Sequence, residues 1–288
     1  MNDAATLPPE VPAADLLAEL PENQATGELA VIYDEIRRFS AVPYVSSLQR
    51  YLATMPGVLE WAWAAIRPAI VSGAIPETGW RLARAVRIAP LPPVSMPVLR
   101  LWGVDADGLA AIRNIAENFV RVSPVNLMTG GCLRLVLTGA IPRGTSFAEA
   151  WNPPPMLAPM PGNVDPAAVP ADIRAVLTQL ATEVDGRPFV PALYRQLAHW
   201  PSFLAWLATE LGPRFDAAET NAARAAFRDT AWQAAPAIVA RLPSLPSNAP
   251  PDAEATRRVL ATIERYAATS PEMVMFGQLL LEALPEAG

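Results

Sequence analysis

Apolar residues recur every three or four positions along most of this chain of 288 residues. Between residues 47 and 66 they stand at Leu48, Leu52, Met55, Leu59, Trp63 and Ile66. This spacing places them on one face of an α-helix that is buried against a neighbour. Segments 78–88 and 108–122 show the same spacing, and strand-like alternation is scarce. The pattern predicts an all-α protein.

One stretch of this pattern occurs twice. At an offset of 145 residues, segments 42–66 and 187–211 are identical at nine of 25 positions, including Arg50/Arg195 and Pro56/Pro201. Further along the chain, similar pairs follow in the same order: Glu117/Glu264, Phe119/Tyr266, Ser123-Pro124/Ser270-Pro271 and Gly130/Gly277. The sequence therefore predicts a tandem duplication of a helical unit, with repeats at 27–140 and 171–288.

Proline marks the segments outside the two repeats. Residues 141–170 contain eight prolines, and proline fixes φ and lacks an N–H, so a Pro-rich linker is expected there. Residues 1–26 are interrupted by four prolines and are expected to be an irregular N-terminal segment. Two related units bury a shared interface as a homodimer does, which predicts an intramolecular pseudo-dimer.

Composition excludes several classes of function. The chain has 52% hydrophobic and 17% charged residues, so it can bury a large core. It has no lysine, which excludes a Schiff-base lysine and a Walker A lysine. A net charge of −6 without an arginine cluster argues against nucleic acid as a partner. No signal peptide or membrane span is recognisable, so we expect a cytoplasmic protein without a membrane partner.

The residues that commonly bind metals or attack substrates are rare here. One histidine and one cysteine do not make a zinc site, and no cofactor-binding motif is present, so neither metal nor cofactor is expected. We expect a capping or interface role for His199, because it lacks a Ser-His-Asp context. Cys132 is expected in the core.

The run from residue 27 to residue 63, GELAVIYDEIRRFSAVPYVSSLQRYLATMPGVLEWAW, resembles the N-terminal part of the group I 2-haloacid dehalogenases. The second motif, LAHWP at 197–201, and the Pro-rich linker fall where that family has them. The resemblance implies an all-α tandem repeat with its site between the copies. It also implies hydrolytic displacement of halide from a short 2-halo acid, in which an Asp activates water and no covalent ester forms.

An ungapped carry-over from LAHWP places the family's site residues on this chain. The catalytic Asp falls at Leu193, its preceding Ser at Ala192, the water-orienting Asn at Ser123, the two pocket aromatics at Tyr44 and Ser47, and the pocket tyrosine at Ile263. The turns that begin at Tyr44 and Phe189 and the Ser-Pro turns at Ser123 and Ser270 are expected to line the cavity. Leucine cannot accept a proton, which leaves the base unassigned.

Two functional hypotheses therefore stay open. The first is an enzyme of the dehalogenase type with a relocated base, for which Asp185 and Glu183 are the nearest acids in sequence. The second is a diverged helical pocket protein that binds or transforms another small apolar carboxylic acid. In both, the expected partner is a small carboxylic acid, and the oligomeric state is open, including a homo-oligomer. A carboxylate that projects into the cavity between the copies would favour the enzyme.

Overall fold

The computed structural model describes residues 18–144, 147, 151–184 and 186–286. In this part of the chain the prediction of an all-α protein is confirmed, since eleven α-helices account for nearly all regular structure. Residues 27–140, the predicted first repeat, contain α1 (Gly27–Ser40), α2 (Ser47–Leu52), α3 (Val58–Val71), α4 (Ala74–Ala83), α5 (Met96–Leu101) and α6 (Ala106–Leu137). The second contains α7 (Ala171–Gln179), α8 (Ala192–Leu197), α9 (Pro201–Phe215), α10 (Ala218–Val239) and α11 (Ala253–Ala283).

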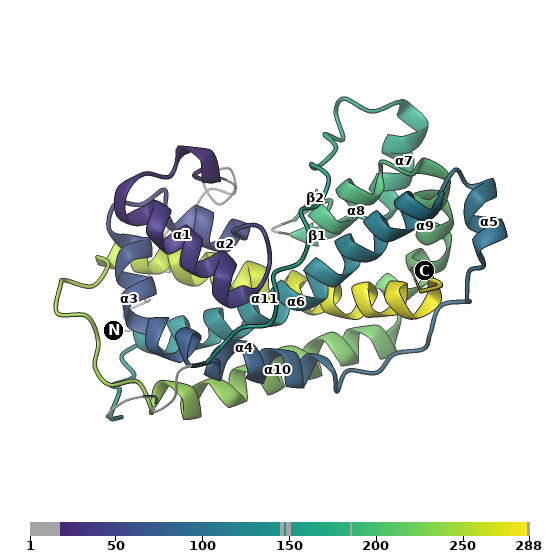
Figure 1. Cartoon of the computed structure of the whole chain (residues 1–288). Coiled ribbons are helices and arrows are strands. Elements are labelled where there is room, and N and C mark those ends of the chain that lie inside the picture. Colours follow the sequence, from purple (N-terminus) through teal and green to yellow (C-terminus); the bar gives the residue numbers. More distant parts are fainter. Residues whose placement is uncertain (1–17, 145–146, 148–150, 185, 287–288) are drawn as a thin grey trace, which may run out of the picture.

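The two longest helices, α6 and α11, lie side by side through the middle of the molecule and make its most extensive helix contact (Figure 1). Their close approach depends on glycine. A Cβ on Gly130 of α6 would lie 3.1 Å from Cγ2 of Ile263, and a Cβ on Gly277 of α11 would lie 3.3 Å from the carbonyl oxygen of Ala116. Ile263 and Ala116 occupy equivalent positions in the two predicted repeats. The contact is thus reciprocal, which favours the tandem duplication; the duplication itself stays a prediction.

The apolar side chains form two clusters, and both long helices contribute to each. The C-terminal half of α6 and the N-terminal half of α11 pack with α1 to α4 and α10. The N-terminal half of α6 and the C-terminal half of α11 pack with α5 and α7 to α9. Cys132 is fully buried in the first cluster, as expected. Residues at the middle of α6 and α11 therefore lie where the two clusters meet.

The predicted Ser-Pro turns are wrong in one respect, because both serines lie inside helices. Pro124 lies within α6 and Pro271 within α11. Each proline removes one hydrogen bond from its helix. The indole Nε1 of Trp80 on α4 donates to the carbonyl oxygen of Arg121, three residues before Pro124, at 2.8 Å. Contacts with the surrounding helices thus keep α6 and α11 helical at prolines that would end an isolated helix.

The described part of the segment 141–170 has no helix or strand, as predicted for a Pro-rich linker. This linker forms hydrogen bonds with both predicted repeats. The N–H of Leu157 donates to the carbonyl of Ala41 at 3.2 Å, and the N–H of Val164 donates to the carbonyl of Arg195 at 3.2 Å. His199 Nε2 donates to the carbonyl of Gly162 at 2.9 Å, an interface role of the expected kind. The linker is therefore held against the helices by hydrogen bonds.

Two further segments bear on the predictions. Residues 18–26 are irregular except for one 3-10 turn, η2 (Glu22–Gln24), whereas residues 1–17 lie outside the described residues. A short antiparallel hairpin, β1 (Thr182–Val184) and β2 (Arg187–Phe189), precedes α8. Within the described residues, no single helix is long and apolar enough to cross a membrane, and only the bent pair α3 and α4 meets that criterion jointly.

Candidate functional site

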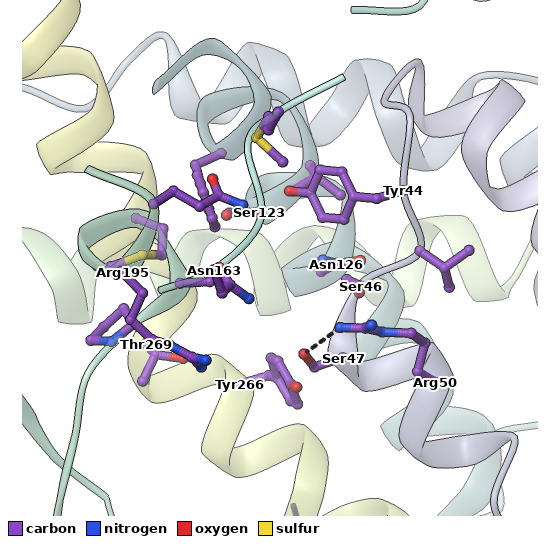
Figure 2. A pocket seen from close by; sticks show the side chains of 18 of the residues that line it. Tyr44, Ser46, Ser47, Arg50, Ser123, Asn126, Asn163, Arg195, Tyr266 and Thr269 are labelled. Atoms are coloured by element: carbon purple, nitrogen blue, oxygen red, sulfur yellow. Dashed lines mark hydrogen bonds between the residues drawn. The ribbon is translucent and has the colours of Figure 1, made fainter. Parts of the chain in front are cut away.

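A cavity of about 640 Å³ lies where the two sets of helices meet (Figure 2). Both predicted repeats, the linker and the N-terminal segment contribute to its wall. The four positions at which we expected the lining to begin, Tyr44, Phe189, Ser123 and Ser270, all line it. The volume falls within the range of roughly 300–1,000 Å³ that is typical of small-molecule sites.

Helices α2 and α8 present matching faces to this cavity. Ser47 and Arg50 on α2 line it, and so do Ala192 and Arg195 on α8. Residues three apart lie on the same face of a helix, so the guanidinium and the small residue of each helix face the same way. Figure 2 shows Arg50 and Arg195 approaching the cavity from different sides. Each predicted repeat therefore supplies one arginine.

The long helices α6 and α11 supply hydroxyls and an amide. Ser123 and Ser270 are each 5% exposed and line the cavity from equivalent positions beside the two internal prolines. Asn126, one turn after Ser123, accepts a hydrogen bond at its Oδ1 from Gln49 Nε2 at 3.0 Å. The hydroxyl of Ser46 donates to Gln49 in turn. This chain of hydrogen bonds fixes the amide of Asn126 at the cavity wall.

The linker and the N-terminal segment complete the wall. Met160 and Asn163 of the linker line the cavity, as do Glu19 and Glu22. Glu22 is held on both oxygens: Oε1 accepts the N–H of Val45 at 2.9 Å, and Oε2 accepts from Arg37. Glu19 Oε2 lies 2.7 Å from Nη2 of Arg50. Two carboxylates therefore border the cavity, and both interact with arginines.

The other two arginines of the wall have no carboxylate partner among the described residues. Arg195 donates through Nε to the carbonyl of Val164 at 3.1 Å, which leaves its terminal nitrogens available. The guanidinium of Arg265 lies 5.3 Å from the ring centroid of Phe189. The wall thus carries an excess of positive charge, although the whole chain has a net charge of −6.

Several buried polar atoms of the wall have no hydrogen-bond partner in the described part of the chain. These atoms are the hydroxyl of Tyr44, Nε of Arg50 and Oε1 of Gln196. A buried polar atom without a partner costs about 1–3 kcal/mol, so a polar ligand that satisfies these atoms would be favoured. Burial raises the pKa of Tyr44 well above its ordinary value and that of Tyr266 to about 12. Both tyrosines therefore remain neutral hydroxyl groups at physiological pH.

The structure brings together four of the six predicted substrate-binding residues. Tyr44, Ser47, Ser123 and Ala192 line the cavity. Leu193, the residue after Ala192, does not line the cavity. It lies on the face of α8 opposite to Arg195, and its side chain is 1% exposed in the second apolar cluster. Ile263 is also 1% exposed and packs against Gly130 in the contact between α6 and α11. Both predictions are wrong for the same reason: each side chain lies on a face of its helix that packs in the core and not on the face that lines the cavity.

Of the two acids proposed as a relocated base, only Glu183 belongs to the described residues, and it does not line the cavity. Glu183 is exposed on β1 and is absent from the lining. Asp185 lies outside the described residues. The carboxylate that does border the cavity with one oxygen unpaired among the described residues is Glu19. Sequence reasoning missed it because Glu19 lies in an irregular segment with no periodicity to orient it.

Arg50 and Arg195 were also missed, although a signal was present. They form one of the nine identical pairs of the repeat, and they are charged in a segment whose other identities are mostly apolar or proline. In the described residues, no group of three or more His, Cys, Asp or Glu side chains could hold a metal ion. The chemistry of the wall is that of arginine, hydroxyl and amide groups, which bind anions through charge-assisted hydrogen bonds.

Comparisons with known proteins show which proteins this chain is similar to. No protein-family model matches the sequence. An (R)-2-haloacid dehalogenase from Rhizobium sp. (strain NHG3) is 25% identical over 231 residues, which cover 74% of this chain and 84% of that protein. A solved D-2-haloacid dehalogenase mutant in complex with D-2-CPA has a TM-score of 0.69 at 19% identity, covering 93% of this chain and 95% of its own. Over most of its length the chain is similar in sequence to a 2-haloacid dehalogenase, and it shares the all-α fold of the D-2-haloacid dehalogenases.

A second solved D-2-haloacid dehalogenase mutant has a TM-score of 0.71 at 18% identity, again covering 93% of this chain and 95% of its own. The family resemblance read from residues 27–63 and from LAHWP is thereby confirmed, and so is the all-α dehalogenase fold. The chain departs from the pattern that the resemblance implies in its second half, at residue 193. At the position expected for the catalytic Asp it has Leu193, which faces the core.

Proposed function

We propose that the cavity binds a small organic acid, with Arg195 as the residue that holds the ligand's carboxylate. The observation that carries this proposal is the free guanidinium of Arg195, which lines the cavity and has no carboxylate partner among the described residues. Buried hydroxyls of Ser123 and Ser270 lie on the same wall and can donate to the same ligand. Apolar side chains of Phe119, Val122 and Met273 can contact its carbon skeleton.

Binding of an acid is consistent with the family, whose named members act on 2-halo acids. The family's hydrolytic route needs a base that deprotonates water, and a general base contributes on the order of 10²- to 10⁴-fold in rate. Leu193 cannot act as that base. The proposal therefore retains the family's kind of ligand and omits its reaction.

We expect Arg195→Gln to weaken the binding of hexanoate by about 10- to 100-fold, because a hydrogen bond to a charged group contributes about 1.5–3 kcal/mol. Isothermal titration calorimetry with hexanoate measures this. Arg81→Gln, which removes an exposed arginine of α4 outside the cavity, is the matched control and should bind hexanoate as the unmodified chain does. Equal affinities for hexanoate in both variants would contradict the assignment of Arg195.

A second function rests on Glu19. Its carboxylate borders the cavity, and Oε1 has no hydrogen-bond partner in the described part of the chain. A carboxylate in this position can deprotonate a water molecule, which would give hydrolytic dehalogenation with the base supplied by the N-terminal segment. Nη2 of Arg50 lies 2.7 Å from Oε2 of the same carboxylate, so a water molecule has to compete with this ion pair for the base.

For this reason we expect the purified protein to release no more halide from either enantiomer of 2-chloropropionate than buffer does. Halide-selective electrode measurements with a dehalogenase as positive control test this. Brisk release that Glu19→Gln abolishes would establish the second function. Release that survives Glu19→Gln and is lost in Glu183→Gln or Asp185→Asn would instead place the base in the hairpin.

A further inference from the structure

Two of the three arginines that line the cavity, Arg50 and Arg195, lie at equivalent places in the predicted repeats. Arg50 follows Ser47 on α2, and Arg195 follows Ala192 on α8, each three residues later. Ser123 and Ser270 add a buried hydroxyl on each side. A wall built in this way offers a site for a negative group at each of two separate places, as Figure 2 shows for Arg50 and Arg195.

The structure shows what kind of group fits at Arg50. The carboxylate of Glu19 lies 2.7 Å from Nη2 of Arg50, and the hydroxyl of Ser47 lies 3.4 Å from the same nitrogen. Nε of Arg50 is buried and has no partner among the described residues. The guanidinium can therefore accommodate a carboxylate that makes a further hydrogen bond, which Glu19 in its present position does not provide.

The ion pair with Arg50 holds the Glu19 side chain only weakly. Its side chain is 31% exposed and that of Arg50 is 26% exposed, and partly exposed ion pairs contribute little to stability. The backbone next to Glu19 is tied separately, because the N–H of Leu20 donates to the carbonyl of Arg50 at 3.0 Å. A rotation of the Glu19 side chain would therefore free the guanidinium without displacing the segment.

The size of the cavity also exceeds what a short halo acid needs. At about 30 Å³ per non-hydrogen atom, as in liquid water, 2-chloropropionate would take under about 200 Å³. The cavity has about 640 Å³. Its wall also contains apolar side chains, which suit a chain of methylene groups: Phe119, Val122, Met160 and Met273.

We infer that the ligand is a dicarboxylic acid, with one carboxylate on Arg195 and the other on Arg50 in place of Glu19. This inference rests on the proposed function, because it takes the site of Arg195 as given. It adds a second anion position and a class of ligand that the family resemblance does not contain.

The test compares hexanoate with adipate, which have the same chain length and differ in one carboxylate. Calorimetry should show adipate binding at least about tenfold more tightly than hexanoate to the unmodified chain. In Arg50→Gln the ratio of the two affinities should fall to within about twofold. In Glu19→Gln, which removes the internal competitor, the ratio should rise. Arg81→Gln should keep the ratio of the unmodified chain.

The outcomes separate the two proposals. Equal affinities for hexanoate and adipate in the unmodified chain would overturn the dicarboxylate inference and leave the role of Arg195 standing. A preference for adipate that Arg50→Gln does not reduce would overturn the assignment of Arg50. Absence of binding for both acids would overturn the proposed function together with the inference. Circular dichroism melting curves for every variant establish that the compared proteins are folded, and Glu19→Gln provides an independent readout should Arg50→Gln fail to fold.

Discussion

Leu193→Asp should destabilise the protein by at least about 4 kcal/mol, the sum expected for removing a buried leucine and burying a carboxyl group without a partner. Leu193 is 1% exposed and packs in the second apolar cluster, on the face of α8 turned away from the cavity. The new carboxyl group would be protonated or would expel α8 from its place. Urea unfolding followed by circular dichroism measures the loss.

Ala192→Asp is the matched control. Ala192 is the neighbouring residue, is partly exposed and lines the cavity, so a carboxylate there remains in contact with water. It also lies in the first turn of α8, where negative charge is favourable. We expect a change within about 1 kcal/mol. Similar stabilities for the two variants would show that Leu193 faces the cavity. Because residue 193 lies on the core face of α8, an Asp placed there does not reach the cavity and should not produce dehalogenase activity.

Between pH 4.5 and 7 the protein should lose about 3 kcal/mol of stability, and Glu272→Gln should remove this loss. Glu272 is 1% exposed on α11, its Oε1 accepts a hydrogen bond from the hydroxyl of Tyr194 at 3.2 Å, and its Oε2 lies 3.6 Å from Nη2 of Arg224. Burial raises the pKa of this carboxyl from 4.5 to about 7, against the opposing effect of Arg224.

The sign follows from the protons bound in each state. The unfolded chain releases the proton of Glu272 near its ordinary pKa, whereas the folded chain keeps it until about pH 7. Between these values the folded state binds more protons, so the free energy of unfolding falls as the pH rises and is level above pH 7. Each pKa unit corresponds to about 1.4 kcal/mol, which gives the stated magnitude.

Chemical unfolding at several pH values, with the unmodified chain and Glu272→Gln compared at each, measures this difference. Glu282→Gln removes an exposed carboxylate from the same helix and should keep the pH dependence of the unmodified chain. A difference between Glu272→Gln and the unmodified chain that does not vary from pH 4.5 to 7 would mean that Glu272 is ionised throughout.

Much of the architecture could be predicted from local patterns. The spacing of apolar residues identified helices in segments 47–66 and 108–122, although the first segment is divided between α2 and α3. The prolines of 141–170 identified a connection without regular structure. The repeat predicted that Tyr44, Phe189, Ser123 and Ser270 lie around one cavity, and they do. These predictions succeed because helix periodicity and proline geometry act over a few residues, and because paired segments of a duplicated chain are expected to occupy equivalent places.

The details of the site were decided by tertiary contacts. Ser123-Pro124 and Ser270-Pro271 were expected to be turns, but packing against neighbouring helices keeps α6 and α11 continuous through them. In a helix of six residues, a rotation by one position exchanges core and cavity, so the sequence alone did not reveal that Arg195 rather than Leu193 lines the cavity.

By itself, then, the sequence determined the helices, their order, the Pro-rich connection and the family to which the chain is related. Only the tertiary structure decided which face of α8 borders the cavity. It also decided that Glu19, which precedes the first predicted helix, forms an ion pair with Arg50 of α2. The physical reason is that apolar burial follows a local period, whereas the position of a charged side chain depends on partners brought together from separate segments of the chain.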